Sequence, residues 1–197
     1  VIYNGFDIDS FPASNYVEPQ SPIKIGVFSR ITNWKGQHIA LDAVSMLPKD
    51  MFELYFVGGC EKADSAYYDK LIKLIKAKEL KNVKFLGYLN DPLPIMGMMD
   101  FILLPSIEPE PFGRVIVEAM ILKKPVIATD MGGAREIIKN DHTGLLVDPD
   151  ANAFILAIQK LAQDPVLCRR LAGNAYMRVL GKFSLEISLK KICLLLP

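Results

Sequence analysis

Short runs of purely apolar residues are the feature that most constrains how this chain folds. Ile102-Leu103-Leu104 and Pro125-Val126-Ile127-Ala128 contain no polar residue at alternate positions that could face water. Strands of this kind are typical of a parallel sheet that helices cover on both faces. The runs alternate with longer amphipathic segments, which predicts an α/β protein with a doubly wound parallel sheet. The predicted strands are 23–29, 53–58, 83–87, 100–105, 125–129 and 144–147, and the predicted helices between them are 35–47, 66–79, 92–98, 113–122, 133–139 and 151–163.

The chain divides into a leading segment, a main domain and a terminal helix. Residues 1–22 show no periodic pattern and are rich in proline, so they are predicted to be a linker between domains. The domain is predicted to cover 23–181, and its last helix opens at Asp164-Pro165. Residues 182–197 start a further helix with Ser184 as its N-cap. Nothing obvious covers the apolar face of that helix, so we expect the chain to be cut from a larger protein.

Composition and charge exclude several classes of protein. The chain is 51% hydrophobic and has a formal net charge of +1, which gives no basic surface for nucleic acid. No apolar run approaches the roughly 20 residues that span a bilayer, and the first residues lack a signal-peptide pattern. Cys60, Cys168 and Cys193 are odd in number and widely spaced, so we interpret them as buried apolar fillers in a reducing compartment. These features predict a cytoplasmic protein.

Two carboxylates flank a predicted helix start. Glu110 precedes Pro111, whose fixed φ suits the first turn, and apolar residues then follow at helical spacing, so the helix is predicted to begin near Phe112 or Gly113. Backbone amides in a first turn lack a carbonyl partner, and the helix dipole adds partial positive charge, which together form an anion site. The amides predicted to form it are those of Phe112, Gly113, Arg114 and Val115.

The positions of the carboxylates indicate what kind of anion would bind. Glu118 is predicted to lie roughly 7–8 Å beyond Gly113 along the helix axis, whereas Glu110 lies on the other side of the helix start. Carboxylates beside a phosphate suit neutral hydroxyl donors, so a sugar and a ribose on either side of a diphosphate are predicted, as in a nucleotide sugar. The alternative is a carboxylate at a helix terminus plus a solvated helix face. Glu118, however, stands among apolar residues, where it needs a hydrogen-bonding partner or costs stability.

Two cations follow the first predicted strand. Arg30 and Lys35 have the fork and the point charge that suit phosphate oxygens, although surface cations are also common in such loops. With the helix start they could neutralise a diphosphate from two sides. Gly58, at the end of the second predicted strand, would let a planar base approach the backbone, or would only make a tight turn. His38 and His142 have no Cys or acidic partner at metal spacing, so no metal is assigned.

In this order, the motifs resemble the C-terminal half of the glycosyltransferase family 4 enzymes, whose GT-B fold combines two Rossmann-like domains. The block from Glu110 to Glu118 is similar to that family's E-x7-E signature. The other matching segments are Asn4-Gly5-Phe6-Asp7, Gly26 with Arg30 and Lys35-Gly36, Phe56-Val57-Gly58, Phe85-Leu86-Gly87, Lys124 to Thr129, Gly132-Gly133 with Glu136, and Thr143 to Val147. The resemblance extends over about residues 1–180.

The resemblance implies retaining transfer of a sugar from a nucleotide diphosphate donor, with neither a metal nor another cofactor required. Arg30 and Lys35 would bind the distal phosphate and stabilise the departing nucleotide. The amides from Phe112 to Val115 would hold the sugar and the pyrophosphate, and Glu110 would accept hydrogen bonds from sugar hydroxyls.

The rest of the donor would contact a second set of residues. Glu118 would accept from the ribose, and the backbone near Gly58, Tyr88 and Leu89 would read the base, with UDP favoured over GDP or ADP. The sequence departs from the family pattern at Arg114, where an apolar residue is frequent, and we interpret the change as tolerated because the amide matters more than the side chain.

The family's N-terminal domain, which supplies acceptor contacts, is not in this chain. We therefore expect this part to bind donor without transferring the sugar, and any membrane contact to occur through the other half. Three alternatives stay open: a nucleotide-sugar epimerase or a phosphorylase of similar fold, a non-catalytic nucleotide-sugar binding domain, and an ordinary dinucleotide-binding domain. The last lacks its G-x-G-x-x-G fingerprint after the first strand.

Overall fold

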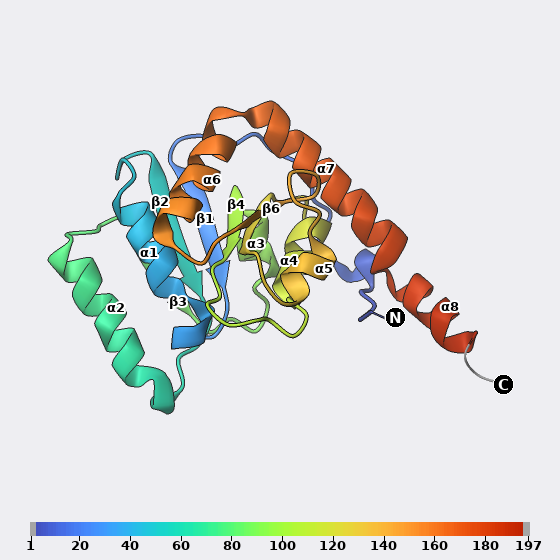
Figure 1. Cartoon of the computed structure of the whole chain (residues 1–197), viewed down its shortest axis with the longest axis horizontal. Coiled ribbons are helices and arrows are strands. Elements are labelled where there is room, and N and C mark those ends of the chain that lie inside the picture. The colour runs from blue at the N-terminus through green and yellow to red at the C-terminus, as the bar shows by residue number, and fades with distance from the viewer. Residues whose placement is uncertain (1–2, 195–197) are drawn as a thin grey trace.

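A computed structural model describes residues 3–194 of the chain (Figure 1). Its centre is a six-stranded sheet in the order β3-β2-β1-β4-β5-β6, and every neighbouring pair of strands is parallel. The doubly wound α/β fold predicted from the sequence is thereby confirmed. The strands are β1 Ile23–Phe28, β2 Phe52–Val57, β3 Val83–Gly87, β4 Phe101–Leu104, β5 Val126–Thr129 and β6 Leu145–Val147.

Helices cover both faces of the sheet. α1, α2 and α6 pack on one face, whereas α3, α4, α5 and the second half of α7 pack on the other, as the ribbon in Figure 1 illustrates. The α-helices are α1 Gln37–Ser45, α2 Ser65–Ala77, α3 Leu93–Gly97, α4 Arg114–Ile121, α5 Gly133–Ile137, α6 Ala151–Gln163, α7 Pro165–Lys182 and α8 Leu185–Cys193. Short 3-10 helices occupy Ile8–Ser10, Asn33–Lys35 and Lys62–Asp64.

The apolar run in β4 follows from its place in the sheet. Phe101 and Leu103 point into the core beneath α1 and α6, and Ile102 and Leu104 point into the core beneath α4. All four side chains are at most 3% exposed, because a central parallel strand has no face in contact with water.

Three predicted helix starts, those of α1, α3 and α4, lie one to two residues early, and for α1 and α4 a glycine is responsible. Gly36 and Gly113 have φ of 68° and 88°, a left-handed conformation that L residues with a side chain rarely adopt. The chain therefore turns sharply at each glycine, and α1 and α4 begin at the following residue. The predicted N-cap of α8 is confirmed, since Ser184 Oγ accepts a hydrogen bond from the Ile187 amide at 3.4 Å.

The leading segment packs against the C-terminal helices. The Phe6 amide donates to the Phe183 carbonyl at 2.9 Å, and the Leu185 amide donates to the Phe6 carbonyl at 2.8 Å. Phe6 is only 3% exposed. The division of the chain at residues 22 and 181 stays a prediction. Parts of the predicted linker and terminal helix, residues 1–2 and 195–197, lie outside the described residues.

The interpretation of all three cysteines as buried fillers is correct only for Cys168. Cys60 and Cys193 are exposed, because the first lies in the loop after β2 and the second in the last turn of α8. Within residues 3–194, no helix combines the length and the apolar character needed to cross a membrane.

We expect Gly36→Ala to destabilise the fold by more than about 2 kcal/mol, because it combines a left-handed φ with a clash. An added Cβ would lie 1.9 Å from the Pro105 carbonyl oxygen. Gly173→Ala is the matched control: Gly173 lies within α7 with open space around it, so alanine should stabilise the helix by about 1 kcal/mol. Urea denaturation measures both changes, and equal stability of the two variants would contradict the packing described here.

Candidate functional site

The candidate site lies where the winding of the sheet reverses. β1 has β2 on one side and β4 on the other, so the loops that leave the carboxyl ends of β1 and β4 diverge from a single point. Ligands of open α/β sheets bind at such switch points. The loop after β1 contains Arg30 and Lys35, and the loop after β4 contains Glu110.

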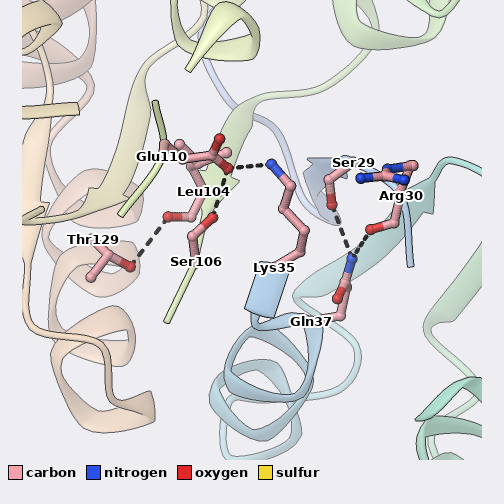
Figure 2. A network of polar contacts seen from close by, with 8 residues as sticks. All are labelled: Ser29, Arg30, Lys35, Gln37, Leu104, Ser106, Glu110 and Thr129. Atoms are coloured by element: carbon pink, nitrogen blue, oxygen red, sulfur yellow. Dashed lines mark hydrogen bonds and ion pairs between the residues drawn. The ribbon is translucent and has the colours of Figure 1, made fainter. Parts of the chain in front are cut away.

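Lys35 and Glu110 meet across this point, as Figure 2 shows. Lys35 Nζ forms an ion pair and hydrogen bond with Glu110 Oε1, and Ser106 Oγ donates to the same oxygen at 2.9 Å. The lysine and glutamate side chains are only 15% and 9% exposed. Removing one partner of a buried pair leaves the other charge without compensation, at a cost of about 3–5 kcal/mol. In the described part of the chain, nothing donates to Glu110 Oε2, which leaves this oxygen able to accept from a ligand.

Two glycines after β5 hold the Glu110 loop in place. The Gly133 amide donates to the Glu110 carbonyl at 2.7 Å. A Cβ on Gly132 would lie 2.6 Å from that carbonyl oxygen, and one on Gly133 would lie 2.4 Å from the Phe112 carbonyl oxygen. The Gly132-Gly133 pair, which the sequence showed only as a glycine-rich turn, therefore lets the loop after β4 pack directly on the start of α5.

The second predicted cation, Arg30, does not join the buried pair. Its Nη1 lies 2.7 Å from Glu61 Oε1, and these side chains are 62% and 63% exposed. An exposed ion pair of this kind contributes little free energy, about 0–1 kcal/mol. Arg30 is thus held loosely near the site, whereas Lys35 is held firmly within it.

The start of α4 provides the backbone part of the site. Gly113 is the N-cap, and no side chain within residues 3–194 caps this helix through a hydrogen bond. Of the four predicted amides, those of Arg114 and Val115 lie in the first helical turn, and those of Phe112 and Gly113 precede it. The helix dipole favours negative charge here. The Phe112 ring packs within an aromatic cluster and stacks on Phe6 at a centroid distance of 6.4 Å.

Glu118 lies one turn further along α4 and is largely buried. Burial raises the pKa of its carboxyl, and Arg114 opposes part of that rise. Arg114 Nε is 3.6 Å from Glu118 Oε1, which is an ion pair too long for a good hydrogen bond. Glu118 therefore has a partner and still costs stability. Arg114, the departure from the family pattern, is its neighbour in this arrangement.

The residues predicted to read a base separate into two groups. Gly58 and Tyr88 line a hollow of about 450 Å³ together with Ile31 and Cys60, whereas Leu89 packs against the core beneath α4. The Gly58 backbone already approaches another chain segment closely, since a Cβ there would lie 2.0 Å from the Ser29 carbonyl oxygen.

Four residues near the site were missed by sequence reasoning. Ser106 lies four positions before Glu110, and Glu61 follows the glycines after β2, so both had a positional signal. Gln37 hydrogen-bonds the Arg30 carbonyl at 2.7 Å, and Cys60 lines the hollow. These two had no signal beyond their place next to a loop.

No group of three or more His, Cys, Asp or Glu residues within the described range could hold a metal ion. His38 Nδ1 lies 3.0 Å from the Tyr67 hydroxyl, and His142 is close to Asn174 on the surface. That the protein needs no metal and no cofactor stays a prediction.

The sheet and its helices form the Rossmann-like half of a GT-B architecture, with a buried Lys–Glu pair at its switch point. The family model described as glycosyl transferases group 1 matches residues 13–178, and the chain belongs to this family.

Individual relatives agree in sequence and in structure. The lipopolysaccharide core biosynthesis glycosyltransferase LpsE of Rhizobium meliloti is 31% identical over 158 residues, which is 80% of this chain and 44% of that protein. HepE of Anabaena, solved with UDP and glucose, superimposes with a TM-score of 0.90 at 32% identity over 98% of this chain and 55% of its own; a further structure of it contains UDP-glucose.

A third relative is matched over its whole length. The C-terminal domain of the glycosyl transferase group 1 family protein LpcC from Francisella tularensis has a TM-score of 0.80 and 27% identity, over 92% of this chain and all of that domain. This chain thus spans about half of LpsE and HepE but the whole of the LpcC domain.

We expect Glu118→Gln to raise the free energy of unfolding at pH 7 by about 1 kcal/mol, because it removes a buried charge. A carboxyl whose pKa is raised in the folded state contributes stability below its unfolded pKa, near 4.5, and loses that contribution as pH rises through the folded pKa. The advantage of the variant should therefore vanish near pH 4 and grow above it in denaturation curves.

Glu186→Gln is the control for this pH dependence. Glu186 is exposed on α8, and its hydrogen bond from Lys190 lowers the pKa of the carboxyl, so its contribution has the opposite sign and is lost as pH falls. A Glu118→Gln protein that is less stable than wild type at pH 7 would contradict the assignment of Glu118 as a buried, costly charge.

Proposed function

We propose that this chain is the donor-binding, C-terminal half of a retaining glycosyltransferase of family 4. The enzyme moves a sugar from a nucleotide diphosphate donor to an acceptor hydroxyl during glycan or glycolipid synthesis. The observation that carries the proposal is the buried cluster of Lys35, Glu110 and Ser106 at the switch point, beside the uncapped start of α4.

The cluster and the helix start divide the work on the diphosphate. The Arg114 and Val115 amides donate to phosphate oxygens, and Lys35 neutralises the negative charge that grows on the distal phosphate as the bond to the sugar breaks. Arg30 leaves its weak pair with Glu61 and adds a second cation. Glu110 accepts from hydroxyls of the sugar, and no metal takes part.

The nucleoside occupies the neighbouring part of the same edge. Glu118 accepts from the ribose, and the base enters the hollow lined by Gly58 and Tyr88. The complexes of HepE with UDP and UDP-glucose support a UDP-sugar as donor, in preference to GDP or ADP. Leu89 contributes to base binding only through its backbone, since its side chain packs in the core.

The other half of the enzyme binds the acceptor. Because this chain spans about half of LpsE and HepE and matches a C-terminal domain over that domain's full length, it binds donor and does not transfer the sugar alone. The complete enzyme works in the cytoplasm, and it contacts a membrane only through its other half.

We expect UDP to bind this chain in calorimetric titrations without added metal, and GDP and ADP to bind more weakly. Arg30→Ala should weaken UDP binding about tenfold or more, the size of a charged hydrogen bond. Arg30 is preferred to Lys35 for this test because losing its exposed pair hardly changes stability. Arg169→Ala, which removes an equally exposed pair with Glu18, is the control. If no nucleotide binds, or if Arg169→Ala has the same effect, the proposal fails.

Bound UDP should also slow alkylation of Cys60, which lines the predicted base site. Cys193 is exposed on α8, so it should react at the same rate with and without UDP, and Cys168 is buried. Mass spectrometry after iodoacetamide treatment reports the three thiols in one sample. Equal protection of Cys60 and Cys193, or no protection of Cys60, would contradict the placement of the base in this hollow.

A further inference from the structure

Gln37 is a polar side chain at a place where the fold does not need one. It is the first residue of α1, and it is fully buried between that helix and the end of β1. Its Nε2 donates to Ser29 Oγ at 2.9 Å and to the Arg30 carbonyl oxygen at 2.7 Å, as Figure 2 shows. Both acceptors belong to the turn from which the Arg30 side chain extends.

The oxygen of the same amide has no hydrogen-bond partner among the described residues. A buried amide oxygen without a partner lowers stability, and an apolar side chain of similar volume would avoid that cost. The opposite orientation of the amide is worse, because it would set Oε1 against the Arg30 carbonyl oxygen. Glutamine at this position therefore lowers the stability of the fold, while its amide nitrogen holds Ser29 Oγ and the Arg30 carbonyl in place.

The other contacts of this turn come from β2 and the loop after it. The Ser29 amide donates to the Val57 carbonyl at 3.0 Å, and the Ile31 amide donates to the Gly59 carbonyl at 2.8 Å. These bonds fix the residues before and after Arg30. The bond from Gln37 acts on the Arg30 carbonyl itself and so sets the direction in which the backbone leaves the site.

The Arg30 side chain is less constrained than the Arg30 backbone. It is mostly exposed, and its ion pair with Glu61 is weak. A flexible side chain reaches a phosphate at low entropic cost only when its point of attachment is fixed.

We infer that Gln37 is a positioning residue for Arg30: by holding the Arg30 carbonyl, it places the guanidinium where the distal phosphate of the donor binds. The inference rests on the proposed function, and it adds a residue that does not touch the donor. It also explains why a buried position beside Ile39 and Ala40 holds an amide.

Titration of Gln37→Met with UDP and with UMP tests the inference. Methionine fills the same space and donates no hydrogen bond, so UDP binding should weaken roughly two- to tenfold. UMP lacks the distal phosphate, so its affinity should stay within twofold of the wild-type value. The melting temperature should change by less than about 4 °C, because the lost bonds and the removed unpaired oxygen oppose each other.

Arg30 and Asn82 provide the controls. In an Arg30→Ala background, Gln37→Met should cause no further loss of UDP affinity, because the residue acts only through Arg30. Asn82 is a matched buried amide: its Oδ1 also lacks a partner, its Nδ2 donates to the Phe52 carbonyl at 2.8 Å, and it lies at the opposite end of the sheet. Asn82→Leu should leave UDP affinity unchanged.

Each result supports or overturns the inference. Three results would each overturn it while wild type still binds UDP: equal weakening for UDP and UMP, an unchanged UDP affinity, or a further loss in the Arg30→Ala background. If wild type binds no UDP, the proposed function fails first and the inference with it. If Gln37→Met does not fold, Gln37→Glu takes its place. Glutamate keeps the shape of the side chain, but its carboxylate repels the Arg30 carbonyl oxygen, so the same pattern of affinities is expected.

Discussion

The buried ion pair between Lys35 and Glu110 is the interaction on which the site depends. It connects the loop after β1 to the loop after β4, two segments 75 residues apart in sequence that follow directly paired strands of the sheet. Desolvating two charges is costly, and the pair is tolerated only because each partner compensates the other and Ser106 adds a hydrogen bond. A closed pair of this kind keeps a lysine and a carboxylate at the switch point, where neither alone would be stable.

That pairing needs loops which approach more closely than side chains allow, and glycines make the approach possible. Gly36 lies against the Pro105 carbonyl in the loop after β4, and Gly58 lies against the Ser29 carbonyl after β1. Gly132 lies against the backbone of Glu110. In each case a single Cβ would come within 2.6 Å of a backbone oxygen. The edge of the sheet is therefore assembled from close backbone contacts between the loops. This explains why the motifs of the sequence consist of glycines next to charged residues.

The sequence predicts the periodic features well and the contacts between distant loops poorly. β4 is apolar on both faces because it is central, so its run Ile102-Leu103-Leu104 identified a covered parallel strand before any pairing was known. Pro111 and the apolar residues at helical spacing after it likewise located the start of α4 to within two residues. The Lys35–Glu110 contact was not predicted, since Lys35 was expected to bind the distal phosphate and Glu110 the sugar hydroxyls, and nothing local in the sequence shows that one reaches the other. The left-handed turns at Gly36 and Gly113, the partner of Arg30 and the exposure of Cys60 also depend on packing between segments far apart in sequence.

Several costly features of this domain gather at one edge of the sheet. Glu118 is a buried carboxyl with an imperfect partner, Gln37 has an amide oxygen without one, and Gly113 holds a left-handed turn. The first two lower the stability of the folded state, and a sequence selected for stability alone would replace them with apolar residues. The opposite end of the sheet has costs of its own: Asn82 has a buried amide oxygen without a partner among the described residues, and burial raises the pKa of Asp100 and lowers the pKa of Lys124. Of these costs, the one at Glu118 is that expected of a site organised before its ligand arrives, because a hydroxyl of the proposed ribose would then supply the partner that the carboxyl lacks.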